Sequence, residues 1–148
     1  MSELRDLYQE LILDHGRRPR NFKELETANC CANGHNPLCG DKLQLRLLCE
    51  NDRIVDVGFQ GSGCAICMAS ASTMSESIKG KLLSEVHSLI GHFIGLVVDG
   101  KKEEAALMPP KLSAFTGVVE FPMRVKCATL AWHTLEAALE GKERASTE

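Results

Sequence analysis

Residues 43–59 read Leu-Gln-Leu-Arg-Leu-Leu-Cys-Glu-Asn-Asp-Arg-Ile-Val-Asp-Val-Gly-Phe. Apolar residues occupy every second position in two runs, at 43, 45 and 47 and again at 55, 57 and 59. Such alternation is typical of strands that bury one face. Asn51-Asp52 between the runs is a turn signal, so this segment predicts an antiparallel hairpin.

The sequence on either side of this hairpin predicts the remaining elements. Before it, apolar residues at helical spacing predict a first helix that ends at Gly16, and a weaker strand is expected near residues 28–32. After it, helical patterns follow at residues 65–79 and 84–97, around 112–119, and from Pro122 to Gly141. Strands first and helices later predict an α+β fold, a small antiparallel sheet of about three strands with helices packed on one face. We expect a single domain over residues 1–143 and a disordered tail at 144–148.

Composition excludes several classes of function. The chain has 148 residues, of which 44% are hydrophobic and 25% charged, as in one soluble domain with a real core. The net charge of −3 lacks the basic footprint of a nucleic-acid-binding protein. No apolar run is long enough to span a membrane and no secretory signal is visible, so we expect a cytoplasmic protein. The short basic run Arg17, Arg18 and Arg20 is either a solvated loop or a docking patch for an acidic partner surface.

Seven cysteines are many for such a chain, and in a reducing compartment they favour metal binding or thiol chemistry over disulfides. The most informative fragment is Asn-Pro-Leu-Cys-Gly-Asp at residues 36–41, where Pro37 and Gly40 favour a bent loop before the first strand of the hairpin. Cys39 and Asp41 are two positions apart, so both side chains can point to one side if the loop is extended. A thiolate and a carboxylate together form a plausible half of a zinc site.

Two further cysteines stand at element boundaries. Cys64 follows Gly61-Ser62-Gly63 and opens a predicted helix, whose N-terminal N–H groups and partial positive charge favour a thiolate. Cys127 lies near the start of the last helix, with Arg124 and Lys126 beside it. Three cysteines and Asp41 would complete a four-coordinate zinc site.

Other interpretations of the cysteines and histidines remain open. Cys64 and Cys67 have the C-x-x-C spacing of a redox pair, although a strand–helix–strand context is not evident. Cys49 is expected to be a small buried residue, and the adjacent Cys30-Cys31 to be structural. His35 is close enough in sequence to Cys39 to bind a metal, but it also suits an ordinary loop residue.

At these residues the chain resembles the U-type iron–sulfur assembly proteins, the IscU/SufU (NifU N-terminal-like) family. The resemblance extends over nearly the whole chain and implies a SufE/IscU-like fold. Its strongest pieces are Asn-Pro-Leu-Cys-Gly-Asp at 36–41, Gly-Ser-Gly-Cys-Ala-Ile at 61–66 and Arg-Val-Lys-Cys-Ala-Thr-Leu-Ala-Trp at 124–132.

Within that family the chain is similar to the SufU branch. The scaffold branch, IscU, has a His directly before its last cysteine, where this chain has Lys126, and a Leu-Pro-Pro-Val-Lys segment that is missing here. The SufU branch has an Arg-x-x-Cys motif, matched by Arg124 and Cys127, and an extra segment between its second and third cysteines, matched around residues 103–112. Cys67 departs from the expected pattern and leaves open an additional thiol that relays sulfur or pairs with Cys64.

The resemblance implies a zinc-dependent sulfurtransferase that accepts persulfide sulfur from a SufS-type cysteine desulfurase and supplies a downstream SufBCD-like assembly complex. Cys39, Asp41, Cys64 and Cys127 would bind the zinc, Cys39 would accept the sulfur, and Arg124 would support the reaction. One alternative is a scaffold for a labile [2Fe–2S] cluster on the same cysteines. Another is a zinc module that only docks partners.

Overall fold

The computed structural model describes residues 2–147, with the side chains of residues 6–147. Its strands form one sheet in the order β3-β2-β1-β4. Their bounds are β1 Cys30–Asn36, β2 Asp41–Glu50, β3 Arg53–Ser62 and β4 Arg144–Ser146. The predicted hairpin is β2–β3, which is antiparallel, and Asn51 and Asp52 at its turn both have positive φ, at 52° and 60°. The weaker strand predicted near 28–32 is also confirmed and extends to Asn36.

The alternation predicted for the second strand of the hairpin is wrong at one position. Val57 and Phe59 are buried as expected, but Val55 is exposed and Ile54 is buried instead. Leu48 pairs with Asp56 whereas Cys49 pairs with Ile54, so a register shift leaves Val55 outside the ladder. An extra residue of this kind reverses the face on which the preceding side chains lie.

The disordered tail predicted at 144–148 is wrong for the described part of that segment. Residues 144–146 form β4, which pairs in parallel with β1. The Asn33 amide donates to the Glu143 carbonyl at 2.8 Å, and the Thr147 amide donates to the His35 carbonyl at 3.2 Å. Glu148 lies outside the described residues. The short polar segment is ordered because the edge of β1 offers it backbone partners, which its own pattern does not reveal.

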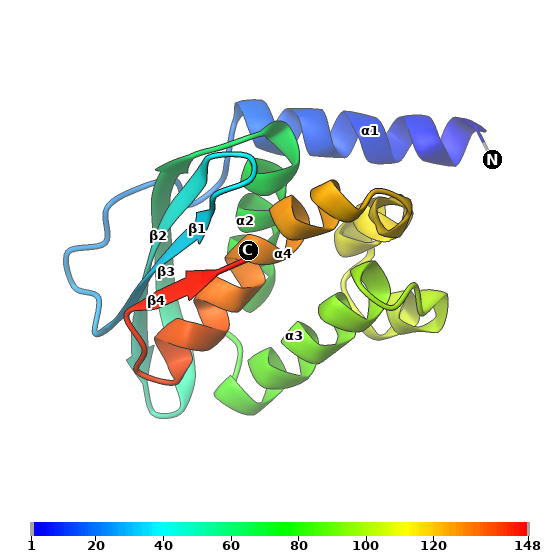
Figure 1. The fold of residues 1–148 in the computed structure, drawn as a ribbon. Helices are drawn as coiled ribbons and strands as arrows, with labels where there is room; N and C mark the ends of the chain where they lie inside the picture. Colours follow the sequence, from blue (N-terminus) through cyan, green and yellow to red (C-terminus); the bar gives the residue numbers. More distant parts are fainter. Residues whose placement is uncertain (1, 148) are drawn as a thin grey trace.

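Helices cover one face of the sheet. They are α1 Ser2–Arg17, α2 Ala65–Ile78, α3 Leu83–Val97 and α4 Pro122–Leu139, and the 3₁₀ helices η1 Lys102–Leu107 and η2 Pro110–Glu120. Figure 1 shows α2, α3 and α4 on one side of the sheet and α1 across the end of these layers. The predicted α+β class with helices on one face is therefore confirmed, and β4 adds a fourth strand to the three expected.

The core lies between the sheet and the helices, with Trp132 of α4 among its largest fully buried side chains. The Trp132 ring stacks on Phe93 of α3, with ring centroids 4.4 Å apart, and its Nε1 donates to Ser70 of α2 at 3.1 Å. These contacts fix α2 against α4. Cys64 caps the N-terminus of α2, and Cys127 lies in the second turn of α4. None of the helices in the described part of the chain has both the length and the apolar character needed to span a membrane.

Candidate metal centre

Cys39 lies on the loop that joins β1 to β2. Asn36 and Asp41 pair as the last rung of that ladder, so residues 37–40 must reverse the chain within four positions. Gly40 makes this possible because its φ of +72° lies in the left-handed region, which a residue with a Cβ rarely adopts. The loop leaves Cys39 exposed while Asp41 is completely buried.

Three of the four predicted ligands converge. One ligand atom each from Cys39, Asp41 and Cys127 lies within 4.8 Å of the other two, and the two sulfur atoms are 3.5 Å apart. The loop, the start of β2 and the second turn of α4 supply these groups. Residues separated by about ninety positions therefore meet as a cluster of two thiols and one carboxylate, as a soft divalent metal requires.

Two neutral donors hold the Asp41 carboxylate. The backbone amide of Cys64 donates to Oδ1 at 2.9 Å, and the side-chain amide of Asn36 donates to Oδ2 at 3.1 Å. Among the side chains that the structure describes, no Lys, Arg or His forms an ion pair with Asp41. A fully buried carboxylate without a cationic partner is costly unless it binds a cation. The donor set and the unpaired carboxylate both fit a bound Zn²⁺.

Cys64 stands next to the cluster as the N-cap of α2. Its sulfur accepts the amide of Cys67 at 3.5 Å, so the thiol faces the positive end of the helix. The Cys64 sulfur is not one of the three candidate ligand atoms that lie within 4.8 Å of one another. It is nevertheless near enough to Cys127 to raise the pKa of that thiol. Its place as the fourth ligand remains a prediction.

Gly63 is the local reason why Cys64 can approach Asp41. A Cβ on Gly63 would lie 2.7 Å from Asp41 Oδ1, closer than real Cβ contacts come. Gly61, with a φ of +145°, has no room either, because its Cβ would overlap the Lys42 carbonyl. The Gly-Ser-Gly turn is thus required by the close packing of the β3 end against the start of β2.

The two buried thiols of the region, Cys127 and Cys67, are held as neutral groups in the absence of a cation. Burial raises the pKa of Cys127, and the thiol of Cys64 and the Asp41 carboxylate raise it further. Burial likewise raises the pKa of Cys67, which is fully buried in the core. A reactive thiol needs exposure and a lowered pKa, so the structure does not favour Cys64 and Cys67 as a redox pair.

Asn36 is a site residue that the sequence did not reveal. Its side chain is fully buried, and besides holding Asp41 its Nδ2 lies 3.7 Å from Cys127 Sγ. Its Oδ1 has no hydrogen-bond partner among the described residues. An Asn before a Pro is an ordinary turn signal, so only the tertiary contacts distinguish it as a residue that holds one candidate ligand and lies close to another.

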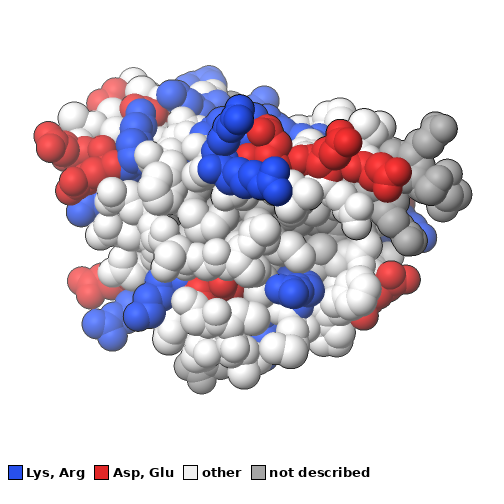
Figure 2. All heavy atoms as spheres, turned by 90° about the horizontal axis from the view of Figure 1, so that it is seen from above, with Lys and Arg blue, Asp and Glu red and all other residues white. Residues whose placement is uncertain are grey.

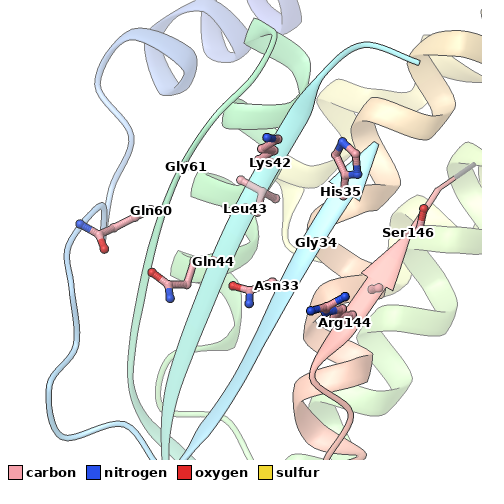
Figure 3. Close-up of a pocket in the computed structure, with 11 residues that line it drawn as sticks. Asn33, Gly34, His35, Lys42, Leu43, Gln44, Gln60, Gly61, Arg144 and Ser146 are labelled. Atoms are coloured by element: carbon pink, nitrogen blue, oxygen red, sulfur yellow. The ribbon is translucent and has the colours of Figure 1, made fainter. Parts of the chain in front are cut away.

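The remaining candidates lie outside the cluster. Arg124 is exposed in the first turn of α4, and its guanidinium makes no hydrogen bond or ion pair with the described residues, so its supporting role is still a prediction. His35 projects from the outer face of the sheet (Figure 3) and is not part of the metal cluster. Cys30 and Cys49 are near each other at the opposite end of the sheet, where burial and the Cys30 thiol raise the pKa of Cys49 to about 12.

Residues 7–146 match the family described as the NifU-like N terminal domain. The chain is 37% identical to the zinc-dependent sulfurtransferase SufU of Bacillus subtilis, over 96% of this chain and 95% of that protein. It is 34% identical to the iron–sulfur cluster assembly scaffold protein IscU of Streptococcus pyogenes, over 95% of this chain and 87% of that protein. The crystal structure of a SUF-system scaffold protein from Fervidobacterium islandicum superposes with a TM-score of 0.82 at 38% identity, covering 88% of this chain and 94% of that one.

Proposed function

The chain belongs to the NifU-like N terminal domain family of iron–sulfur cluster assembly proteins, and from this we propose that it is a zinc-dependent sulfurtransferase working with a SufS-type cysteine desulfurase. One observation carries the proposal. The exposed Cys39 thiol and two buried groups, Asp41 and Cys127, form a cluster suited to zinc beside the loop that joins β1 to β2. The similarity to a relative named as a zinc-dependent sulfurtransferase supports this activity.

Cys39 is the group best placed to accept sulfur. It is exposed on a loop, whereas Cys127 is buried on a helix and Cys64 is half-buried as a helix cap. In the proposed step the Cys39 thiolate attacks the outer sulfur of the desulfurase persulfide. The sulfur–sulfur bond of the donor breaks, a new one forms on Cys39, and the donor cysteine leaves as a thiolate. No oxidant or reductant is consumed.

The other groups position and protect Cys39. When bound, zinc stabilises the cysteines as thiolates at neutral pH and shields them from oxidation. Asp41, fixed by Asn36 and the Cys64 amide, is the oxygen ligand and the weakest soft-metal donor of the set. Arg124 places an exposed cation near the start of α4, where it supports approach of the anionic persulfide. Cys39, Asp41, Cys64 and Cys127 together are the proposed zinc ligands.

The test is alanine release by the cognate desulfurase, measured with zinc-loaded wild type, with Cys39→Ala and with Cys31→Ala. Cys31 is a matched control because it is also an exposed free cysteine but lies outside the cluster. We expect wild type and Cys31→Ala to stimulate alanine release strongly and Cys39→Ala to give none while remaining folded. Stimulation by Cys39→Ala would remove Cys39 as the acceptor, and unfolding of Cys39→Ala on loss of zinc would favour a purely structural zinc module.

A second function, a scaffold that carries a labile [2Fe–2S] cluster, is favoured by the similarity to relatives named as IscU scaffolds. The same three cysteines are cluster ligands by type. Anaerobic reconstitution with iron and sulfide tests it. Stoichiometric iron and acid-labile sulfide that move to an apo-protein would establish a scaffold. Absence of stimulation by zinc-loaded wild type in the alanine assay would point the same way. A downstream SufBCD-like complex is the proposed acceptor of the sulfur, and the cytoplasm its proposed location.

A further inference from the structure

The outer face of the sheet, opposite the helices, holds an open trough of about 790 Å³. It crosses all four strands, and no helix of the described residues covers it (Figure 1). Figure 3 shows the side chains that line it: Gln60, Gln44, Asn33 and Arg144 stand in a row across the strands, with Lys42, His35 and Ser146 beside them.

The register of the sheet creates these rows. Gln60 pairs with Gln44, Gln44 with Asn33, and Asn33 with Arg144. The next row places Lys42 beside His35 and His35 beside Ser146. Every lining side chain of the two rows can donate a hydrogen bond, and none is a carboxylate. The trough is therefore built to receive hydrogen-bond acceptors along an extended line.

The two permanent cations of the trough, Lys42 and Arg144, have no carboxylate partner among the side chains of residues 6–147. Both side chains are exposed. In the basic run noted in the sequence, Arg20 differs from these two cations because its guanidinium pairs with Asp14 at 2.7 Å. On the face seen from the α1 side, Lys and Arg side chains lie among Asp and Glu side chains (Figure 2).

These features favour an acidic protein segment over a nucleic acid as the occupant. The whole chain carries a net charge of −3, so it lacks the overall basic charge that is typical of nucleic-acid-binding domains. Two cations among amide donors instead suit a few carboxylates on an extended backbone. Amide side chains can pair with peptide groups as well as with carboxylates.

The trough begins beside the metal cluster. Lys42 directly follows Asp41 in β2, and the loop that bears Cys39 joins β1 to β2, two of the strands that line the trough. We propose that this trough binds an extended acidic segment of the sulfur-donating partner and so sets the donor's persulfide next to Cys39. This inference rests on the proposed sulfurtransferase function for the identity of the partner.

The test compares wild type with Lys42→Glu/Arg144→Glu and with the control Lys81→Glu/Lys101→Glu. The control changes the net charge equally at two exposed lysines that do not line the trough. Calorimetry gives the Kd for the desulfurase at low and high salt, and alanine release at saturating concentration gives the maximal rate. We expect the trough variant to bind about tenfold more weakly at low salt and with a smaller salt dependence, whereas the control should keep the wild-type Kd. Poly-L-glutamate should compete with the desulfurase for wild type.

Several results would overturn the inference. A Kd for the trough variant within about twofold of wild type, or an equal loss in the control, would show that the trough is not the docking surface. Competition by single-stranded DNA but not by poly-L-glutamate would assign the trough to nucleic acid. The milder variant Lys42→Gln/Arg144→Gln controls for a folding defect. Its Kd for the desulfurase should lie between the Kd of wild type and that of Lys42→Glu/Arg144→Glu. If wild type binds the desulfurase without stimulating alanine release, the sulfurtransferase proposal fails. The Kd comparison still shows whether the trough is the docking surface for the desulfurase.

Discussion

Gly63→Ala should weaken zinc binding by displacing Asp41, although residue 63 is not itself a ligand. The new Cβ would lie 2.7 Å from Asp41 Oδ1, and ordinary contacts begin at 3.4 Å, so the carboxylate must retreat by about 0.7 Å. Metal–ligand distances in protein sites lie within about 0.2 Å of their standard values, so a shift of this size is incompatible with normal coordination by Asp41. The movement also strains the 2.9 Å hydrogen bond from the Cys64 amide.

The expected loss is about 10- to 100-fold in zinc affinity, the range seen when groups that orient a metal ligand are altered. That corresponds to about 1.4–2.8 kcal/mol of binding free energy. Affinity is measured by competition with a chromophoric chelator. Gly91→Ala on α3 is the control, because its Cβ meets nothing within 4 Å and the substitution should leave zinc affinity unchanged.

A double-mutant cycle shows whether the effect passes through Asp41. If it does, Gly63→Ala should cost little further affinity in an Asp41→Ala background, since the displaced carboxylate is already gone. Wild-type affinity in Gly63→Ala, or full additivity of the two changes, would refute the assignment of Asp41 as a positioned ligand.

Three further changes test the fold that holds the site. Trp132→Ala should lower the free energy of unfolding by about 3–5 kcal/mol in urea titrations, because the fully buried ring stacks on Phe93. Gly34→Ala should cost about 1–3 kcal/mol because its Cβ overlaps Thr134 Oγ1, and Thr134→Ala should recover part of that loss. Burial lowers the pKa of His15 below its ordinary 6.5, so the native state binds this proton less readily than the unfolded chain. Neutral His15 therefore contributes its full stabilisation above about pH 6.5, and this contribution declines as the pH falls. In His15→Gln the free energy of unfolding should fall less between about pH 7.5 and about pH 5 than it does in wild type.

The local elements and the chemical types at the site could be predicted from the residues alone. The hairpin followed from the alternation around Asn51-Asp52, and the last helix began at Pro122 as predicted. The ligand candidates were recognisable because Cys39 stands in a loop, Cys64 at a helix cap and Cys127 near the start of a helix, where a loop or helix end can present a side chain.

Which of these groups meet depends on long-range packing that local sequence patterns do not encode. The sequence could not show that β4 pairs with β1, because a three-residue polar strand has no periodicity and depends on a long-range edge for its hydrogen bonds. It could not show that Asn36 holds Asp41 and approaches Cys127, since that contact joins residues 91 positions apart. The trough is likewise a product of register: single polar residues on four strands form one continuous polar surface only when the sheet aligns them.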